Sequence, residues 1–258
     1  MHYYAKTNQI PPQFLLFFFN SSNLMEKYFK VQFEFDHEEL EQTIVQKSYN
    51  GKGYCCFIDS NLLVESRKTN NNRVLKVLNE SLVNSCDGSY IAYLASIFYR
   101  KKLKEYSGPK FFNKFIYHPE TQCIVGNTST VFQKIKAKLN REGTGSNLHY
   151  VSLPFTDVDQ FDYKSIAKQI NEINPQYIWV SLGAPKQEIF MSQLLPHLNR
   201  GVMLGVGAAL NYFSGEIKCI PLWAIKTHLI WFYRILSEPE KQINRVLKIL
   251  RYYPRVFL

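Results

Sequence analysis

Short apolar segments rich in β-branched and aromatic residues alternate along this chain with segments in which apolar residues recur at helical spacing. When a helix connects two strands, the second strand runs parallel to the first, and parallel sheets have helices packed on both faces. The sequence therefore predicts an α/β fold with a Rossmann-like, doubly wound, mostly parallel sheet. Strands are predicted at 28–35, 54–58, 122–126, 149–153, 177–182 and 202–206, and helices from Asp36 through the forties and at 73–81, 89–104, 128–140, 163–173 and 186–196.

One strand ends with a glycine and the next helix opens with a proline, in Gly183-Ala184-Pro185-Lys186-Gln187. Open α/β sheets form their ligand crevice at the carboxyl ends of strands, which is where this glycine falls. Pro185 suits the first helical position because its missing N–H would have no partner there. A helix amino terminus also favours a phosphate, and Lys186 and Gln187 add donors beside it. An ordinary strand-to-helix turn explains the same residues, so both interpretations stay open.

The composition limits the class of protein. A chain of 258 residues, 46% of them hydrophobic, can bury the core of one large domain, with or without a small appendage. The cysteines are odd in number without a Cys-x-x-Cys pair, and the histidines lack metal-ligand spacing, so we expect reduced thiols and neither disulfides nor a zinc site. The cysteines are Cys55, Cys56, Cys86, Cys123 and Cys219, and the histidines are His2, His37, His118, His149, His197 and His228.

The carboxyl-terminal segment 216–258 is basic and aromatic. It holds eight basic against three acidic residues, which is half of the chain's net charge of +10. Aromatic and aliphatic residues lie between the charges, so we expect helical segments with one basic and one apolar side. Such segments bind anionic membrane surfaces. Packing of the aromatic residues onto the sheet, with the charges in solvent, explains the same pattern and stays open.

Several segments, in this order and spacing, resemble the WecG/TagA/CpsF family of bacterial glycosyltransferases over residues 25 to 250. They are Asp87-Gly88, Gly183-Ala184-Pro185-Lys186-Gln187-Glu188, the stretch 205–215, Pro221-Leu222-Trp223, Trp231-Phe232-Tyr233-Arg234 and Glu238-Pro239.

The resemblance implies an inverting, metal-independent glycosyltransferase. The donor would be UDP carrying an N-acetylmannosamine-type sugar or a uronic acid derivative, and the acceptor a polyprenyl-diphosphate-linked sugar in cell-surface polysaccharide synthesis, as in capsule or teichoic acid. No cofactor is expected besides the UDP-sugar substrate. The implied location is cytoplasmic, peripheral on the inner face of the plasma membrane.

The resemblance also predicts the domain organisation. It starts near Met25, so residues 1–24 are predicted to be an amino-terminal extension. The apolar run 14–19 within it is too short to span a bilayer and lacks a basic leading segment, so we predict no signal peptide. Residues 25–215 would form the α/β catalytic domain, and 216–258 a helical appendage at the membrane and the active site.

Asp87 is the candidate catalytic base. By sequence alone, an Asp-Gly pair after a short apolar segment is better explained as a turn or helix cap. The resemblance reverses that preference, because the aligned aspartate is the residue that the family uses to take the acceptor's proton. For the departing diphosphate, the candidates are Arg234 and, less strongly, Arg245, since guanidinium groups match phosphate oxygens.

The remaining candidates would bind substrate. The turn contributes Gly183, Lys186, Gln187 and Glu188. The absent side chains of Gly205 and Gly207 would let the donor approach the backbone. Asn61 matches an early asparagine of the family.

The chain departs from the family pattern at two of these places. Where the family has Gly-Gly-x-Phe-Asp, this chain ends its motif in Asn211, whose amide can bind a sugar hydroxyl but cannot take a proton. Asp59 stands where the family has threonine, which puts the contact of Asn61 in doubt and adds a second acidic group.

Asp157-Val158-Asp159 has the Asp-x-Asp form that holds a divalent metal in many other glycosyltransferases. Helix capping explains these residues better, and the resemblance implies a metal-independent enzyme. We therefore expect no metal ligands.

Other function classes fit less well. A dehydrogenase needs Gly-x-Gly-x-x-Gly after its first strand, but Gly51-x-Gly53 precedes the strand and lacks the third glycine. A pI near 9.2 suggests nucleic acid, yet much of the charge lies in an apolar, aromatic tail, so we expect no nucleic-acid partner. A non-catalytic protein that binds nucleotide-sugar or membrane stays open if Asn211 marks lost activity, and an oligomer is compatible with the sequence.

Overall fold

The computed structural model describes residues 26–68, 72–144 and 147–217, together with Pro221, Leu236, Pro239, Ile243 and Leu247. Within these residues the central feature is a six-stranded sheet in the order β4-β3-β8-β7-β5-β6, and every neighbouring pair is parallel. This confirms the predicted α/β fold. The strands are β3 (Lys52–Ile58), β4 (Val83–Cys86), β5 (Gln122–Gly126), β6 (Leu148–Val151), β7 (Tyr177–Ser181) and β8 (Gly201–Gly205).

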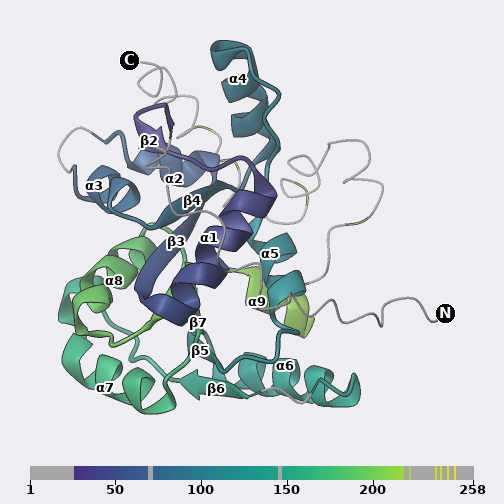
Figure 1. Ribbon diagram of the computed structural model, residues 1–258, viewed down its shortest axis with the longest axis vertical. Helices are drawn as coiled ribbons and strands as arrows, with labels where there is room; N and C mark the ends of the chain where they lie inside the picture. Colours follow the sequence, from purple (N-terminus) through teal and green to yellow (C-terminus); the bar gives the residue numbers. More distant parts are fainter. Residues whose placement is uncertain are drawn as a thin grey trace.

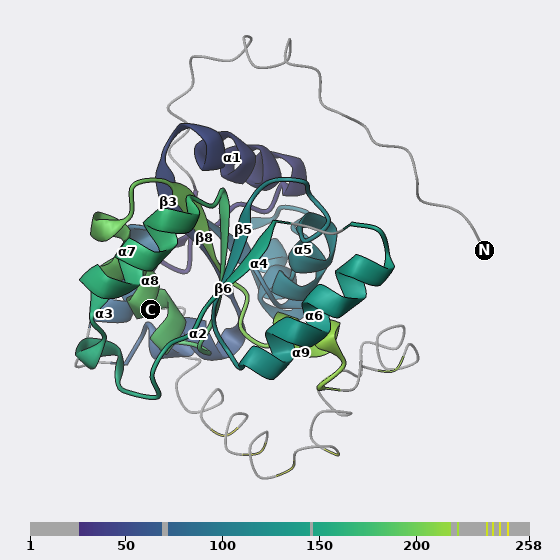
Figure 2. The same ribbon diagram turned by 90° about the horizontal axis from the view of Figure 1, so that it is seen from below.

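Helices cover both faces of this sheet, as Figures 1 and 2 show. Residues of α2, α3, α4, α7 and α8 join one buried apolar cluster, and residues of α1, α5, α6 and α9 join the other. The described helices are α1 (His37–Asn50), α2 (Ser60–Glu65), α3 (Arg73–Asn79), α4 (Ser89–Tyr99), α5 (Gly108–Phe115), α6 (Ser129–Arg141), α7 (Tyr163–Ile173), α8 (Lys186–Leu194) and α9 (Ala209–Ser214).

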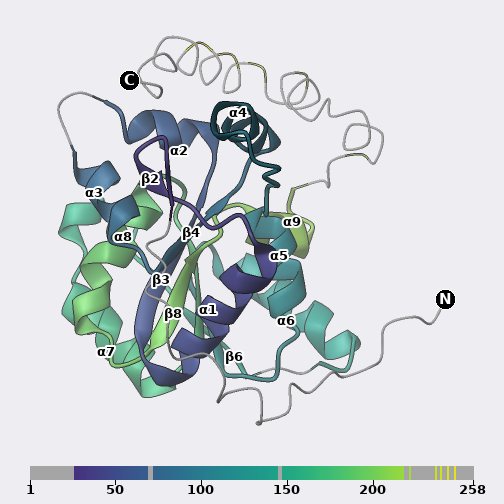
Figure 3. The same ribbon diagram turned by 45° about the horizontal axis from the view of Figure 1, so that its top comes forward.

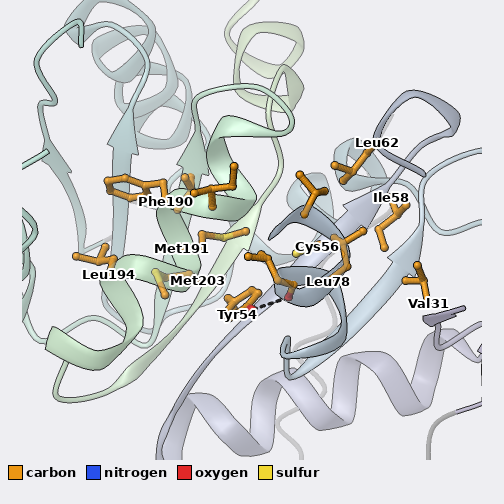
Figure 4. Packing of buried hydrophobic residues seen from close by; sticks show 14 of the residues in the cluster. Val31, Tyr54, Cys56, Ile58, Leu62, Leu78, Phe190, Met191, Leu194 and Met203 are labelled. Atoms are coloured by element: carbon orange, nitrogen blue, oxygen red, sulfur yellow. Dashed lines mark hydrogen bonds between the residues drawn. The ribbon is translucent and has the colours of Figure 1, made fainter. Parts of the chain in front are cut away.

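Side chains along β3 alternate between the two clusters, because successive residues of a strand point to opposite faces. Tyr54, Cys56 and Ile58 belong to the cluster beneath α8, whereas Cys55 and Phe57 belong to the other. Figure 4 shows the first cluster, in which the Tyr54 hydroxyl donates a 2.6 Å hydrogen bond to the Val77 carbonyl. Burial on both faces explains why these strands are apolar runs rather than alternating sequences.

The predicted strand 28–35 is wrong in its extent. The structure has an antiparallel hairpin of β1 (Lys27–Tyr28) and β2 (Val31–Gln32) instead. Phe29 and Lys30 turn the chain with φ of 52° and 60°, a left-handed conformation that an apolar run does not reveal. The predicted helix 89–104 ends early, at Tyr99, because Arg100 is left-handed. Helices α2, α5 and α9 are short and went unpredicted.

The parallel arrangement places all six carboxyl ends at one edge of the sheet, and β8 lies between β3 and β7. Helices α2 and α4 follow β3 and β4 directly, and they lie close together at the end of the molecule that Figure 3 turns forward. None of the helices in the described part of the chain is long and apolar enough to cross a bilayer.

Gly201 at the start of β8 gives a test of this packing. Its φ is +93°, and a Cβ there would lie 2.4 Å from the Pro175 carbonyl oxygen. Gly143 has a similar φ of +71° but open space around it. We expect Gly143→Ala to lower the free energy of unfolding by about 1 kcal/mol through backbone strain alone. Gly201→Ala should lower the free energy of unfolding by about 1–3 kcal/mol more than Gly143→Ala does, because the backbone must also move to make room for the Cβ. Urea unfolding of both variants measures this, and equal losses would contradict the close approach at β8.

Candidate active site

The predicted site residues that the structure describes follow strands β3, β4, β7 and β8 at the carboxyl edge. Asn61 lies in α2 just after β3, and Asp87 follows β4 directly. The Asp87 N–H donates a 2.9 Å hydrogen bond to the Ile58 carbonyl, which ties the ends of these two strands together. Both side chains are half-buried. The backbone of Asp87 is therefore held at the carboxyl edge of the sheet, next to the start of α4.

Gln187 and Glu188 lie in the first turn of α8 and are both buried. The Gln187 side-chain N–H donates to Glu188 Oε1 and to the Gly205 carbonyl, each at 2.8 Å. Burial raises the pKa of Glu188 from 4.5 to about 7, the hydrogen bond from Gln187 opposes this, and the negative charge of Asp59 adds to it. Asp59 directly follows β3, a strand that contacts α8.

Two buried acceptor atoms of this pair, Gln187 Oε1 and Glu188 Oε2, have no hydrogen-bond partner among the described residues. Buried polar atoms are nearly always paired, because desolvation without a hydrogen bond is costly. Both atoms lie beside the carboxyl end of β8, where Gln187 also binds the Gly205 carbonyl. Sugar hydroxyl and amide N–H groups are donors that match acceptors of this kind.

The glycines near α8 differ in what they permit. A Cβ on Gly205 would lie 2.7 Å from Met191 Cε and 3.2 Å from Gln187 Nε2, so glycine there lets α8 pack against β8. Gly207 has φ of +52°, with Gln187 Oε1 3.4 Å from its Cβ position. Gly183 has φ of +77° and open space around it. The structure thus supplies a packing reason for Gly205, whereas Gly183 leaves room beside the helix.

Pro185 precedes α8 as its N-cap residue, one position earlier than predicted, and the Ala184–Pro185 peptide is cis. The Lys186 ammonium donates to the Thr156 carbonyl and lies 5.2 Å from the centre of the Phe161 ring. This side chain therefore reaches the loop after β6. In the described structure its ammonium binds that loop.

A polar network that the sequence did not reveal joins three strand ends. The Asn127 side-chain N–H, just after β5, donates to Ser181 Oγ and to Asn211 Oδ1, each at 2.9 Å. Ser181 in turn donates to the Gly207 carbonyl at 2.8 Å. Asn211 is thus held in position by Asn127. The signal available was the Gly126-Asn127 pair at the end of a predicted strand, since Asn127 takes a left-handed φ of 62°.

Sequence comparison assigns the chain to a family. The sequence profile of the glycosyl transferase WecG/TagA/CpsF family matches residues 27–258. The chain belongs to this family. A Bacillus subtilis (strain 168) protein named N-acetylglucosaminyldiphosphoundecaprenol N-acetyl-beta-D-mannosaminyltransferase is 37% identical over 91 residues, which is 35% of each chain. A protein of the same name from Bacillus spizizenii is 34% identical over 95 residues, 37% of each chain. The alignment thus spans about a third of the length of these relatives.

Family membership places the two predicted arginines, Arg234 and Arg245, within the matched region, but both lie outside the described residues. The structure does describe Asp59, whose carboxylate caps α2 by accepting a 2.8 Å hydrogen bond from the Leu62 N–H. Asp59 therefore has a structural role as the cap of α2, a position that aspartate favours.

The Asp157-Val158-Asp159 segment has a different role from the one predicted. Asp159 forms an ion pair with Arg73, with N–O distances of 2.5 and 3.0 Å, and accepts from Gln193 at 3.2 Å. The helix cap is Asp162 instead, which accepts from the Ser165 N–H at 3.0 Å. Within the described residues, no group of three His, Cys, Asp or Glu side chains is arranged to hold a metal ion.

The raised pKa of Glu188 makes a prediction about stability. Its folded pKa of about 7 exceeds its ordinary value of 4.5, so between these values the folded state holds a proton that the unfolded state has lost. Stability contributed by this proton is present below pH 4.5 and is lost as pH rises through 7, by about 1.4 kcal/mol per pH unit.

Replacing Glu188 with glutamine should remove this dependence. We expect the unfolding free energy of Glu188→Gln to fall less than that of the native chain between pH 5 and 7, measured by urea titration. Glu172→Gln, at an exposed site on α7, is the control and should follow the native curve. Parallel curves for all three proteins would show that the Glu188 pKa is not raised.

Proposed function

We propose that this chain is an inverting glycosyltransferase that moves an N-acetylmannosamine-type sugar from UDP to a sugar on a polyprenyl diphosphate. Its family supports glycosyl transfer, and the names of the two Bacillus proteins support the sugar and the lipid-linked acceptor. The single observation that carries the proposal is that Asp87 and the buried Gln187–Glu188 pair follow strands whose carboxyl ends lie at the same edge of a parallel sheet. Ligands of open α/β folds bind at this edge.

Asp87 is the general base in this proposal. Its carboxylate takes the proton from the acceptor hydroxyl while the hydroxyl oxygen attacks the anomeric carbon of the donor sugar. The bond to UDP breaks on the opposite side, so the configuration inverts in one displacement. The position at the end of β4 suits this task, because the backbone of Asp87 is held by the Ile58 carbonyl while the residue stays partly exposed.

Donor recognition is assigned to the turn and α8. Gln187 Oε1 and Glu188 Oε2 would accept hydrogen bonds from hydroxyl or N–H groups of the donor, which removes the cost of burying them unpaired. Asn211, held by Asn127, would contact a sugar hydroxyl, and Asn61 would lie beside the acceptor. Arg234 and Arg245 would stabilise the departing diphosphate in place of a metal ion.

The carboxyl-terminal appendage would bring these arginines over the site and contact the inner face of the plasma membrane. Four of its described residues, Leu236, Pro239, Ile243 and Leu247, are helical and exposed. Leu236, Ile243 and Leu247 are thus exposed apolar residues within a segment whose sequence is basic, which supports binding to an anionic surface.

The base assignment is tested by Asp87→Asn. We expect the rate of transfer from UDP-N-acetylmannosamine to a polyprenyl-diphosphate-linked N-acetylglucosamine to fall roughly 10²- to 10⁴-fold, because the amide cannot accept the proton. Binding of UDP, measured by calorimetry, should stay near the native value. Asp157→Asn makes the same change at an exposed position and should retain full activity. An undiminished rate in Asp87→Asn would remove this residue from the mechanism.

Metal independence is tested separately. We expect transfer to continue at its native rate in excess chelator, since arginines and the α8 amino terminus would neutralise the diphosphate. The assay compares rates with chelator, without it, and with manganese or magnesium restored. Loss of activity that either ion restores would overturn this part of the proposal.

A further inference from the structure

Helix α4 is apolar on both of its faces. Ile91, Ala92 and Ala95 are buried in the cluster beneath the helix. Tyr90, Tyr93 and Ile97 lie on another face, since they are spaced by three and four residues, and they are 55%, 62% and 54% exposed. A helix on a protein surface ordinarily has a polar outer face, so this arrangement needs an explanation.

The sequence pattern alone did not separate the faces of this helix. Phe98 shares its spacing with Ile91 and Ala95 but is 58% exposed, and it widens the apolar surface beside Ile97. Figure 1 shows α4 projecting from the end of the molecule farthest from α7 and β6. The exposed residues of the helix therefore lie at an extremity that a flat surface can reach. We call Tyr90, Tyr93, Ile97 and Phe98 the α4 patch.

Basic residues border the α4 patch. Arg100, Lys102 and Lys104 follow the helix and are exposed. The β1–β2 hairpin is fixed to the same end of the helix, because the Phe29 N–H donates a 2.9 Å hydrogen bond to the Tyr99 hydroxyl. This hairpin adds further exposed lysines. Together, segments 26–30 and 100–105 hold six basic and two acidic residues, and one acid, Glu26, is paired with Lys101.

We propose that the α4 patch docks onto an anionic phospholipid bilayer, with its apolar side chains in the interface and the basic border at the headgroups. An apolar helix face bordered by lysine and arginine is the combination that binds such surfaces, through burial of apolar area and attraction to anionic lipid. Tyrosine suits this position because its ring is apolar and its hydroxyl remains hydrated.

Docking through α4 would set the position of the active site relative to the membrane. The helix starts two residues after Asp87, so a bilayer against α4 lies beside the carboxyl edge of the sheet. A lipid-linked acceptor in that bilayer would then meet the site without leaving the membrane. This consequence rests on the proposed function, whereas the docking itself rests on α4 and its border alone.

The test is flotation of the full chain with vesicles of phosphatidylcholine, with and without phosphatidylglycerol. We expect binding that needs phosphatidylglycerol and weakens with salt. Tyr93→Ser combined with Ile97→Ser should reduce partitioning at least about tenfold, since two side chains lose their burial. Tyr49→Ser, at a residue near the end of α1 that is 51% exposed, is the control and should bind as the native chain does.

A second variant tests the basic border. Lys102→Glu with Lys104→Glu should also reduce partitioning, and the reduction should shrink as salt rises. Urea unfolding checks that both double variants fold. Unchanged flotation of folded Tyr93→Ser/Ile97→Ser would overturn the proposal. So would a lipid-free dimer of the native chain that this variant dissociates in sedimentation, because a second copy would then cover the patch.

An assay with a short, water-soluble acceptor tests glycosyl transfer separately from membrane docking. The Tyr93→Ser/Ile97→Ser variant should keep native activity on that acceptor and lose it only on acceptor embedded in vesicles. Absence of transfer by the native chain would refute the proposed function and leave flotation as the test of docking. Equal loss on both acceptors would instead show that α4 acts within the active site, and would count against docking.

Discussion

The structure depends on one constraint, which is that all six described strands of the sheet run in the same direction. Parallel strands need a crossover for each return, so every strand end is followed by a loop and most by a helix at the same edge. The residues after β3, β4, β5, β7 and β8 therefore lie along one edge of the sheet although they are far apart in sequence. Asp87, Asn127 and Gln187 share this edge through the topology alone.

The central position of β8 in the sheet restricts the space for side chains near its ends. Strands flank β8 on both sides and helices pack on both faces, so little space remains for side chains near its ends. At the carboxyl end, a Cβ on Gly205 would lie 2.7 Å from Met191 Cε; at the opposite, amino end, a Cβ on Gly201 would lie 2.4 Å from the Pro175 carbonyl oxygen. The same packing buries Glu188 and raises its pKa. Buried polar atoms left without partners are costly to the fold, which is consistent with a site built to pair them with a ligand.

The sequence could predict the elements that depend on local pattern. The strands predicted at 54–58, 122–126, 149–153, 177–182 and 202–206 and the junction before α8 follow from runs of β-branched residues and from glycine and proline, and the structure confirms them within a few residues. The Asp36 cap of α1 was likewise predicted, and its carboxylate accepts from two N–H groups. Strand β4 was not predicted, because Asn84 and Ser85 interrupt its apolar pattern. The Asn127–Asn211 contact could not be predicted, because it depends on the register of strands distant in sequence. The β1–β2 turn was missed because two ordinary residues adopt left-handed backbone there.

Helix α4 shows the limit of pattern reasoning most clearly. Its apolar residues fit a helix in any orientation, so hydrophobic spacing predicts the helix but not which face meets the sheet. Tertiary packing decides that, and Ile91, Ala92 and Ala95 lie inward where the helix approaches β4. Tyr93 and Ile97 lie outward. Two of the three buried residues are alanines, which allow close approach of the helix to the sheet. An apolar outer face at the edge that holds Asp87 therefore connects the packing of the helix to where a lipid-linked substrate would arrive.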